Sequence, residues 1–181
     1  MNKLKKVNKL KKNKVIDYLS QKEIILILNK PFSLKEKTLF LIFLETGCTI
    51  SEFTNLKVKN IDFNKNTIRL RKNKNSICSI NKETINKIKI IIKQDEIKSN
   101  DYLFKSRESS QITERRVQQI LLEIGHKIEI KLNQRLLRTT FAIRSFLNRI
   151  PLKEIERILG INNAQNYIYK FFKEKDLEVL T

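Results

Sequence analysis

The chain has 181 residues, which is long enough for one domain with a buried core, and 40% of its residues are hydrophobic. Thirty-eight Lys and Arg against nineteen Asp and Glu give a formal net charge of +19, so nucleic acid is the expected partner. The many Lys, Asn and Ile residues, which AT-rich codons encode, are a second explanation of this basicity. No apolar run approaches the eighteen or so residues of a membrane-spanning helix, which excludes that class.

The two cysteines, Cys48 and Cys78, show no sign of a metal site or a disulfide framework. They lack C-x-x-C spacing and have no histidine nearby. We therefore expect no metal or other cofactor, and a protein of the reducing cytoplasm. The basic N-terminus is followed by no apolar segment or cleavage site of a signal peptide.

Two units are expected along the chain. Residues 1–17 form a basic arm with seven lysines in its first fourteen positions, which either lies along phosphates or is a solvated tail. Residues 18–181 form a single domain, because no Pro-, Gly- or Ser-rich linker and no internal repeat divides them.

Capping boxes predict where the first helices begin. Residues 20–23, 33–36 and 49–52 each read Ser or Thr followed three residues later by Glu. Pro31 breaks the first helix. Gly47 ends the second, because glycine accepts the left-handed conformation that closes a helix.

A small antiparallel sheet is predicted next. Residues 61–70 (IDFNKNTIRL) and 76–80 alternate apolar and polar side chains, which indicates two or three short strands. The polar turn RKNKN at 71–75 connects them.

Helical spacing returns in the second half of the chain. One helix is expected from residue 81, and another from Thr113 that ends at Gly125, with His126 in the following loop. Residues 98–107 between these helices form a loop.

The last predicted elements lie near the C-terminus. Helices over 136–149 and 152–159 are separated by Pro151, and the second ends at Gly160. An amphipathic segment follows from about Asn166 to Leu180. The predicted fold class is therefore α+β, mainly α, with one small antiparallel sheet.

Four segments in order carry a resemblance to a known family. They are TGCTISEFTNLKVKNIDF at 46–63, the strand pair around RKNKN, DYLFKSR at 101–107, and LLRTTFA followed by LKEIERILGI within 136–161. Together they resemble the catalytic domain of the tyrosine recombinase (phage integrase) family over roughly residues 18–172. The resemblance implies that family's helical catalytic fold, and leaves no room for its usual N-terminal DNA-clamping domain.

The resemblance also implies a reaction and a partner. In this family a tyrosine attacks a phosphodiester of double-stranded DNA and forms a phosphotyrosyl bond during site-specific recombination. Since no metal takes part, positive side chains must stabilise the anionic phosphorane.

Several positions match the family's active-site pattern. Arg138 stands at the second catalytic arginine, inside LLRTTFA, and Arg135 stands where a histidine or lysine is usual. Either Lys72 or Lys74 matches the lysine of the strand-pair turn. Tyr169 is the candidate nucleophile, although it is one residue closer to the preceding motif than usual.

Tyr167 is the alternative nucleophile. Each candidate also has a plainer interpretation: Arg138 holds a carboxylate, Tyr169 fills a groove with its ring, and the turn lysines are ordinary turn residues.

Three positions depart from the pattern. The family reads T-G-x-R-x-S-E, but Thr49 occupies the place of the first arginine, where the residues themselves predict a helix cap. Thr139 replaces a histidine, and Ile161 replaces the histidine or tryptophan after L-G. We therefore expect a DNA-binding, recombinase-like protein with a degraded active site. The alternatives are a non-catalytic DNA-binding accessory protein and an RNA-associated basic protein.

The final segment, YIYKFFKEKDLEVL, is expected to be an amphipathic helix. Phe171, Phe172 or Leu177 then contacts a second copy or a related recombinase, as such helices do in the family. Folding of this segment onto its own domain is the other interpretation.

Overall fold

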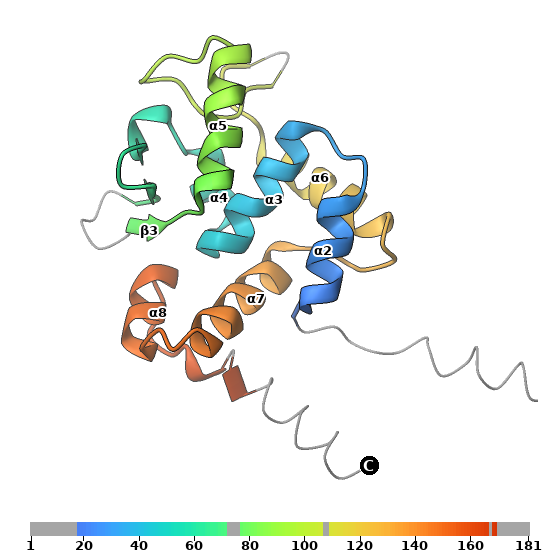
Figure 1. Ribbon diagram of the computed structural model, residues 1–181, viewed down its shortest axis with the longest axis vertical. Coiled ribbons are helices and arrows are strands. Elements are labelled where there is room, and N and C mark those ends of the chain that lie inside the picture. Colours follow the sequence, from blue (N-terminus) through green and yellow to red (C-terminus); the bar gives the residue numbers. More distant parts are fainter. Residues whose placement is uncertain (1–17, 72–76, 107–108, 167, 170–181) are drawn as a thin grey trace, which may run out of the picture.

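The computed structural model describes residues 18–71, 77–106, 109–166 and 168–169 (Figure 1). Its named helices are α2 (Gln21–Asn29), α3 (Leu34–Thr46), α4 (Ile50–Thr54), the short 3-10 helix η1 (Val58–Asn60), α5 (Lys82–Gln94), α6 (Glu114–His126), α7 (Gln134–Leu147) and α8 (Leu152–Leu159). A three-stranded antiparallel sheet accompanies them, so the predicted fold class is confirmed. Among the described residues no helix is long and apolar enough to span a membrane.

Capping boxes begin the first three of these helices, as predicted. Ser20, Ser33 and Thr49 each accept a hydrogen bond from the third backbone N–H of their helix, while the glutamate at that position accepts from the cap residue. These bonds satisfy N–H groups that a helix start otherwise leaves without partners. Gly47 ends α3 with a φ of 59°, in the left-handed region that favours glycine.

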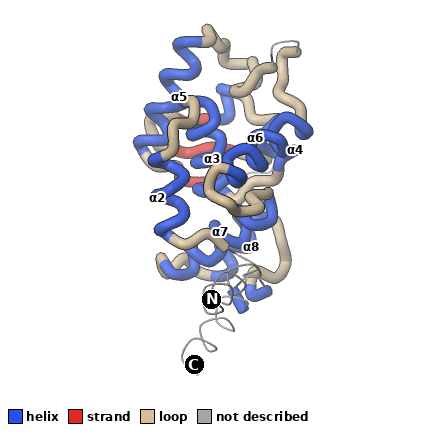
Figure 2. The backbone as a smooth tube through the Cα atoms, turned by 90° about the vertical axis from the view of Figure 1, so that its right-hand side faces the viewer, coloured by secondary structure: helices blue, strands red, loops and turns tan. Residues whose placement is uncertain are grey.

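Helix α3 lies at the centre of the molecule in both views (Figures 1 and 2). It contacts α5 and α7, and its residues from Thr38 to Leu44 are all buried. Phe43 stacks on Phe53 of α4 with 4.9 Å between ring centroids, and Phe53 in turn lies 4.7 Å from Phe104. Burial of these large apolar side chains joins α4 and the 98–106 loop to the central helix.

The sheet lies beside this core and follows the predicted order. Its strands are β1 (Ile61–Asp62), β2 (Thr67–Arg69) and β3 (Ile77–Ser79), with β2 in the middle. Ile68 pairs with Ile61 on one side and with Cys78 on the other, and all three side chains are buried. The alternation seen in the sequence therefore marks the inner face of the sheet.

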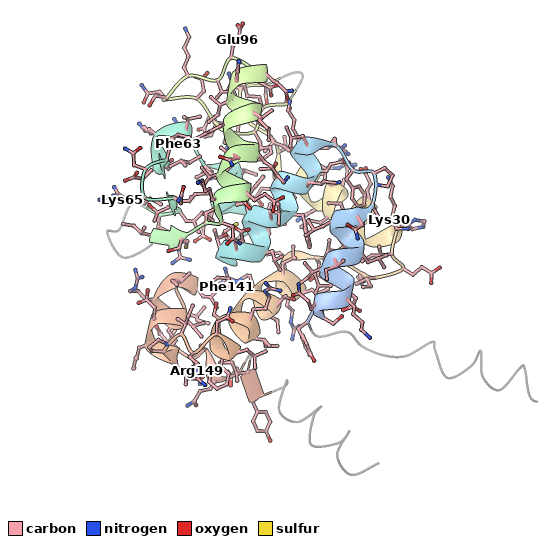
Figure 3. All side chains as sticks on the ribbon, in the orientation of Figure 1. Lys30, Phe63, Lys65, Glu96, Phe141 and Arg149 are labelled. Carbon is pink, nitrogen blue, oxygen red and sulfur yellow. The ribbon has the colours of Figure 1, made fainter. Side chains whose placement is uncertain are left out.

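Helices α7 and α8 build a second, smaller apolar cluster with Cys78 of β3. Phe141, which Figure 3 labels on α7, belongs to it and also packs against Gly47. A Cβ atom at Gly47 would lie 2.8 Å from the Phe141 ring and 2.7 Å from Leu159. Glycine thus permits the end of α3 to touch α7 and α8.

Two predictions about the end of α6 are wrong. Gly125 lies inside α6, and His126 is the last residue of that helix and not a loop residue. The glycine is needed because the chain folds back over it: the Ile130 N–H donates to the Gly125 carbonyl, and a Cβ there would lie 2.3 Å from the Ile130 carbonyl oxygen. Close approach of backbone, and not helix termination, explains this residue.

Candidate active site

The guanidinium of Arg138 is buried where the ends of two helices meet. Arg138 is 8% exposed and lies on α7. Its Nη1 donates to the Gly47 carbonyl at 2.6 Å, and its Nη2 donates to the Leu159 carbonyl at 3.0 Å. These carbonyls close α3 and α8, and the C-terminal end of a helix favours a cation. The charge is therefore fixed in place by backbone groups.

A second guanidinium, that of Arg71, reaches the same carbonyl. Arg71 follows β2, and its Nη2 donates to the Leu159 oxygen at 2.9 Å. Its Nε forms an ion pair with Glu52 of α4. Arg71 and Arg138 thus lie beside each other although they are far apart in the sequence. We call Arg71, Arg138, Glu52 and the carbonyls of Gly47 and Leu159 the arginine cluster.

Glu52 connects the arginine cluster to Thr49. One carboxylate oxygen of Glu52 accepts from Arg71, and the other accepts from the Thr49 N–H at 2.7 Å. The Thr49 hydroxyl accepts from the Glu52 N–H at 3.1 Å, so the predicted role of Thr49 as a helix cap is confirmed. The side chain of Gln134 at the start of α7 also accepts from the Ile50 N–H, which places α4 against α7.

The other candidate residues differ in what surrounds them. Arg135 is exposed on α7, and the hydroxyl of Thr139 donates to the Arg135 carbonyl as a bond within the helix. Ile161 is half-buried beside the α7–α8 cluster. Tyr169 is 68% exposed, and neither bond of Arg138 goes to it. Their roles in a reaction stay predictions.

Three further candidates, Lys72, Lys74 and Tyr167, lie outside the described residues. Arg71, the first residue of the expected turn RKNKN, is not among the candidates that the sequence predicts. A cation next to Lys72 at the end of a strand was the only signal in the sequence, and nothing local predicts that its side chain reaches α8.

The cysteines lie next to the arginine cluster and are buried. Burial raises the pKa of the Cys48 thiol to about 12, and burial likewise raises that of Cys78 to about 12. Both are therefore neutral, unreactive thiols at ordinary pH. Within the described ranges no group of three or more His, Cys, Asp or Glu side chains is placed to hold a metal ion.

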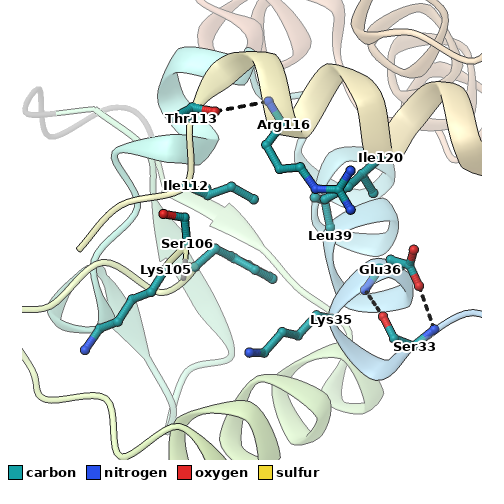
Figure 4. A pocket seen from close by; sticks show the side chains of 11 residues that line it. Ser33, Lys35, Glu36, Leu39, Lys105, Ser106, Ile112, Thr113, Arg116 and Ile120 are labelled. Carbon is teal, nitrogen blue, oxygen red and sulfur yellow. Dashed lines mark hydrogen bonds between the residues drawn. The ribbon is translucent and has the colours of Figure 1, made fainter. Parts of the chain in front are cut away.

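A hollow, here called the charged cleft, lies at the N-terminal end of α3, the end away from the arginine cluster (Figure 4). Its lining combines apolar side chains with Lys35, Lys105 and Arg116. Each of these cations has a carboxylate partner: Asp95, Asp101 and Glu123, in that order. At a rise of about 1.5 Å per residue, the eleven steps along the chain from Glu36 to Gly47 separate the cleft from the arginine cluster by roughly 16 Å.

Comparison with known proteins identifies the family. The model of the phage integrase family matches residues 14–173. The chain belongs to the phage integrase family. Tyrosine recombinase XerA of Saccharolobus solfataricus is 29% identical over 164 residues, which cover 87% of this chain and 54% of that protein. XerA of Pyrococcus horikoshii is 24% identical over 166 residues, covering 88% of this chain and 58% of that protein.

Solved structures show the same fold. A crystal structure of XerA recombinase superposes with a TM-score of 0.73 at 24% identity, over 83% of this chain and 56% of that one. XerH bound to palindromic difH substrate gives 0.71 at 20% identity, over 87% and 49%. The Tn1549 integrase in complex with circular intermediate DNA gives 0.69 at 16% identity, over 94% and 69%. This integrase-family chain therefore spans about half the length of the XerA relatives that it matches.

Proposed function

We propose that this chain binds double-stranded DNA and serves site-specific recombination, with the arginine cluster facing a backbone phosphate. The observation that carries the proposal is the fixed guanidinium of Arg138, whose two bonds go to backbone carbonyls and use two of its five N–H donors. A cation oriented before the substrate arrives stabilises developing negative charge without reorganisation. Family membership and the DNA complexes of the structural neighbours support DNA as the partner.

The reaction proposed is strand breakage and rejoining through a phosphotyrosine. Tyr169 attacks the phosphorus atom, the bond from phosphorus to the 5′-oxygen breaks, and Lys72 or Lys74 gives that oxygen a proton. Arg138 binds the non-bridging oxygens and Arg135 donates a further hydrogen bond. The proton of the tyrosine passes to solvent.

Cleavage by this chain should be slow. Thr49 is engaged as a helix cap, and Ile161 offers no hydrogen bond to a phosphate. Loss of one oriented donor typically costs about 10²–10³ in rate. The active site proposed here thus holds a phosphate better than it cleaves one.

Covalent capture tests the reaction. Radiolabelled, nicked duplexes with a randomised core are incubated with the full chain, and denaturing gels are examined for protein that carries label. A faint covalent band that disappears in Tyr169→Phe and persists in Tyr167→Phe is expected. A band as strong as that of an active recombinase would contradict the expected slow cleavage. A band that disappears in Tyr167→Phe instead would identify Tyr167 as the nucleophile.

Duplex binding tests the partner independently of cleavage. Because each neutralised phosphate releases counterions, the logarithm of the association constant should fall steeply and linearly with the logarithm of salt concentration. Sequence preference should be weak. A flat dependence would mean that the +19 charge is not used on nucleic acid.

An accessory role is the second candidate function. It is favoured by Thr49, whose hydroxyl and N–H are both used in the capping box. An accessory protein would bind duplex DNA with the same salt dependence and form no covalent product, even as Thr49→Arg. The family match leaves the RNA-associated alternative without support.

The C-terminal segment is proposed to contact a second copy or a related recombinase on DNA. Residues 170–181, including Phe171, Phe172 and Leu177, lie outside the described residues. Truncation after Lys170 should weaken assembly on DNA in sedimentation experiments and leave the melting temperature unchanged. A truncated chain that no longer folds would favour packing of the segment on its own domain.

A further inference from the structure

Two guanidinium groups meeting at one oxygen atom form an unusual arrangement that the helix cap at Thr49 does not explain. Arg71 and Arg138 both donate to the Leu159 carbonyl, at 2.9 and 3.0 Å. Like charges repel at such short range, and one carbonyl carries only a partial negative charge. Glu52 compensates one of the two positive charges. The arginine cluster therefore keeps a formal charge of +1 in a largely buried place.

Both arginines are held in fixed orientations from two sides. Arg138 lies between the carbonyls of Gly47 and Leu159, and Arg71 lies between Glu52 and Leu159. The side chain of Arg71 is 24% exposed, so a ligand in solvent can reach it. Two oriented guanidinium groups, one of them accessible, match the needs of a phosphate with two non-bridging oxygens.

Position 49 lies beside this pair. Thr49 is joined to Arg71 through the two oxygens of a single carboxylate, that of Glu52. An arginine at position 49 would begin from the same helix start, whose backbone N–H already bonds that carboxylate. Arg71 reaches the neighbourhood of Glu52 from the end of β2 instead.

We propose that Arg71 supplies the guanidinium that is absent at position 49, and that Arg71 and Arg138 together bind one phosphate group of DNA. This inference rests on the proposed function and names a ligand of its site. Glu52 is then a positioning residue, which orients Arg71 and does not touch the phosphate. The Leu159 carbonyl is an acceptor that both arginines share, and it therefore fixes their positions relative to each other.

Nuclear magnetic resonance of the arginine Nε–H groups tests the inference directly. The full chain, labelled with ¹⁵N, is titrated with inorganic phosphate, and the variants Arg71→Lys and Arg138→Lys assign the two signals. Both signals should shift with one common dissociation constant. An Arg138 signal that moves while the Arg71 signal stays still would overturn the inference, since Arg71 would then be structural only.

Affinity in variants provides the second measure. Arg71→Ala should weaken phosphate binding about tenfold or more, as expected for loss of a charge-assisted hydrogen-bond pair. Arg69→Ala is the matched control: Arg69 is exposed on β2, and its loss removes the same charge nearby but should change affinity less than about twofold. If Arg71→Ala and Arg69→Ala weakened phosphate binding equally, Arg71 would contribute only its net charge, and the inference would be contradicted.

A reciprocal variant makes the test specific. Thr49→Arg combined with Arg71→Ala should restore phosphate affinity to within about threefold of the original chain, because the guanidinium returns beside Glu52. Thr49→Arg that restores nothing counts against the exchange of roles. Duplex DNA binding is measured in parallel. If binding depends steeply on salt but the Arg71 signal does not respond to phosphate, this inference alone is rejected. If the chain does not bind duplex DNA, the proposed function is rejected as well.

Discussion

The two ends of α3 present cations in different ways. At the C-terminal end, Arg138 is buried and bonded to backbone carbonyls of two helices. At the N-terminal end, the cations of the charged cleft form ion pairs near the surface, such as that of Lys35, whose side chain is 53% exposed. A buried, oriented cation can recognise one phosphate, while solvated pairs add attraction to any polyanion. The net charge of the chain therefore does not show where recognition occurs.

The largest effect expected at neutral pH comes from breaking the arginine cluster. Arg138→Ala removes two charge-assisted hydrogen bonds, so unfolding free energy should fall by about 3–5 kcal/mol. The Gly47 carbonyl loses its side-chain donor, whereas the Leu159 carbonyl keeps that of Arg71. Urea denaturation followed by circular dichroism measures it. A loss below about 1 kcal/mol would show that water replaces the guanidinium easily and that the site is not dry.

The next effect concerns stability at alkaline pH, because two buried cysteines lie beside the arginine cluster. The folded-state pKa values of Cys48 and Cys78 are raised to about 12, above the usual value near 9. Their contribution to stability is therefore complete below pH 9 and is lost as pH rises towards 12, by at most about 1.4 kcal/mol per pH unit for each thiol. The single variant Cys48→Ala and the double variant Cys48→Ala with Cys78→Ser should lose less unfolding free energy than the original chain as pH rises from about 9 to 12. Denaturation curves at several pH values measure this loss. An unchanged decline would place its origin elsewhere.

A smaller effect is expected from Gly160, against which Arg71 lies. Gly160 ends α8 with a φ of 65°, and a Cβ there would lie 2.4 Å from Nη1 of Arg71. Gly160→Ala should cost about 1–2 kcal/mol through left-handed backbone strain and should displace Arg71. Thermal melting measures the cost, and the shift of the Arg71 Nε–H signal measures the displacement. A lower melting temperature with an unchanged Arg71 signal would show that the helix cap at Gly160 does not position Arg71.

The smallest effect belongs to the charged cleft. Lys105→Ala and Arg116→Ala should each change unfolding free energy by no more than about 1 kcal/mol, because exposed ion pairs contribute little. Each should lower the salt slope of DNA binding by at most about one phosphate contact. A loss of stability comparable to that of Arg138→Ala would remove the contrast between the two ends of α3.

Local chemistry explains which parts of the fold were predictable. Capping boxes and the glycines at 47 and 160 mark helix ends through bonds and dihedral angles within a few residues, and these predictions are confirmed. The same local role predicted for Gly125 is wrong, because glycine is needed there to let a later backbone segment pass close to it. A long-range contact leaves no local pattern in the sequence.

The candidate site divides along the same line. Arg138 was found by its motif, but its partners were not: it bonds carbonyls of Gly47 and Leu159, 91 and 21 residues away, and no carboxylate within the described ranges. Arg71 was missed because its bond to Leu159 crosses 88 residues. Motifs locate residue types, whereas the meeting of side chains depends on tertiary packing.

The ion pair of Glu52 with Arg71 has a consequence for how this sequence can drift over evolutionary time. A carboxylate that already receives one guanidinium has little use for a second, so an arginine at position 49 and one at position 71 should be alternatives in related chains. On the proposed role of Arg71, a lineage can then pass between the two arginines through an intermediate that carries both, without a step in which the proposed phosphate site lacks its second arginine. Substitution at either position alone should be harmful or neutral according to what stands at the other.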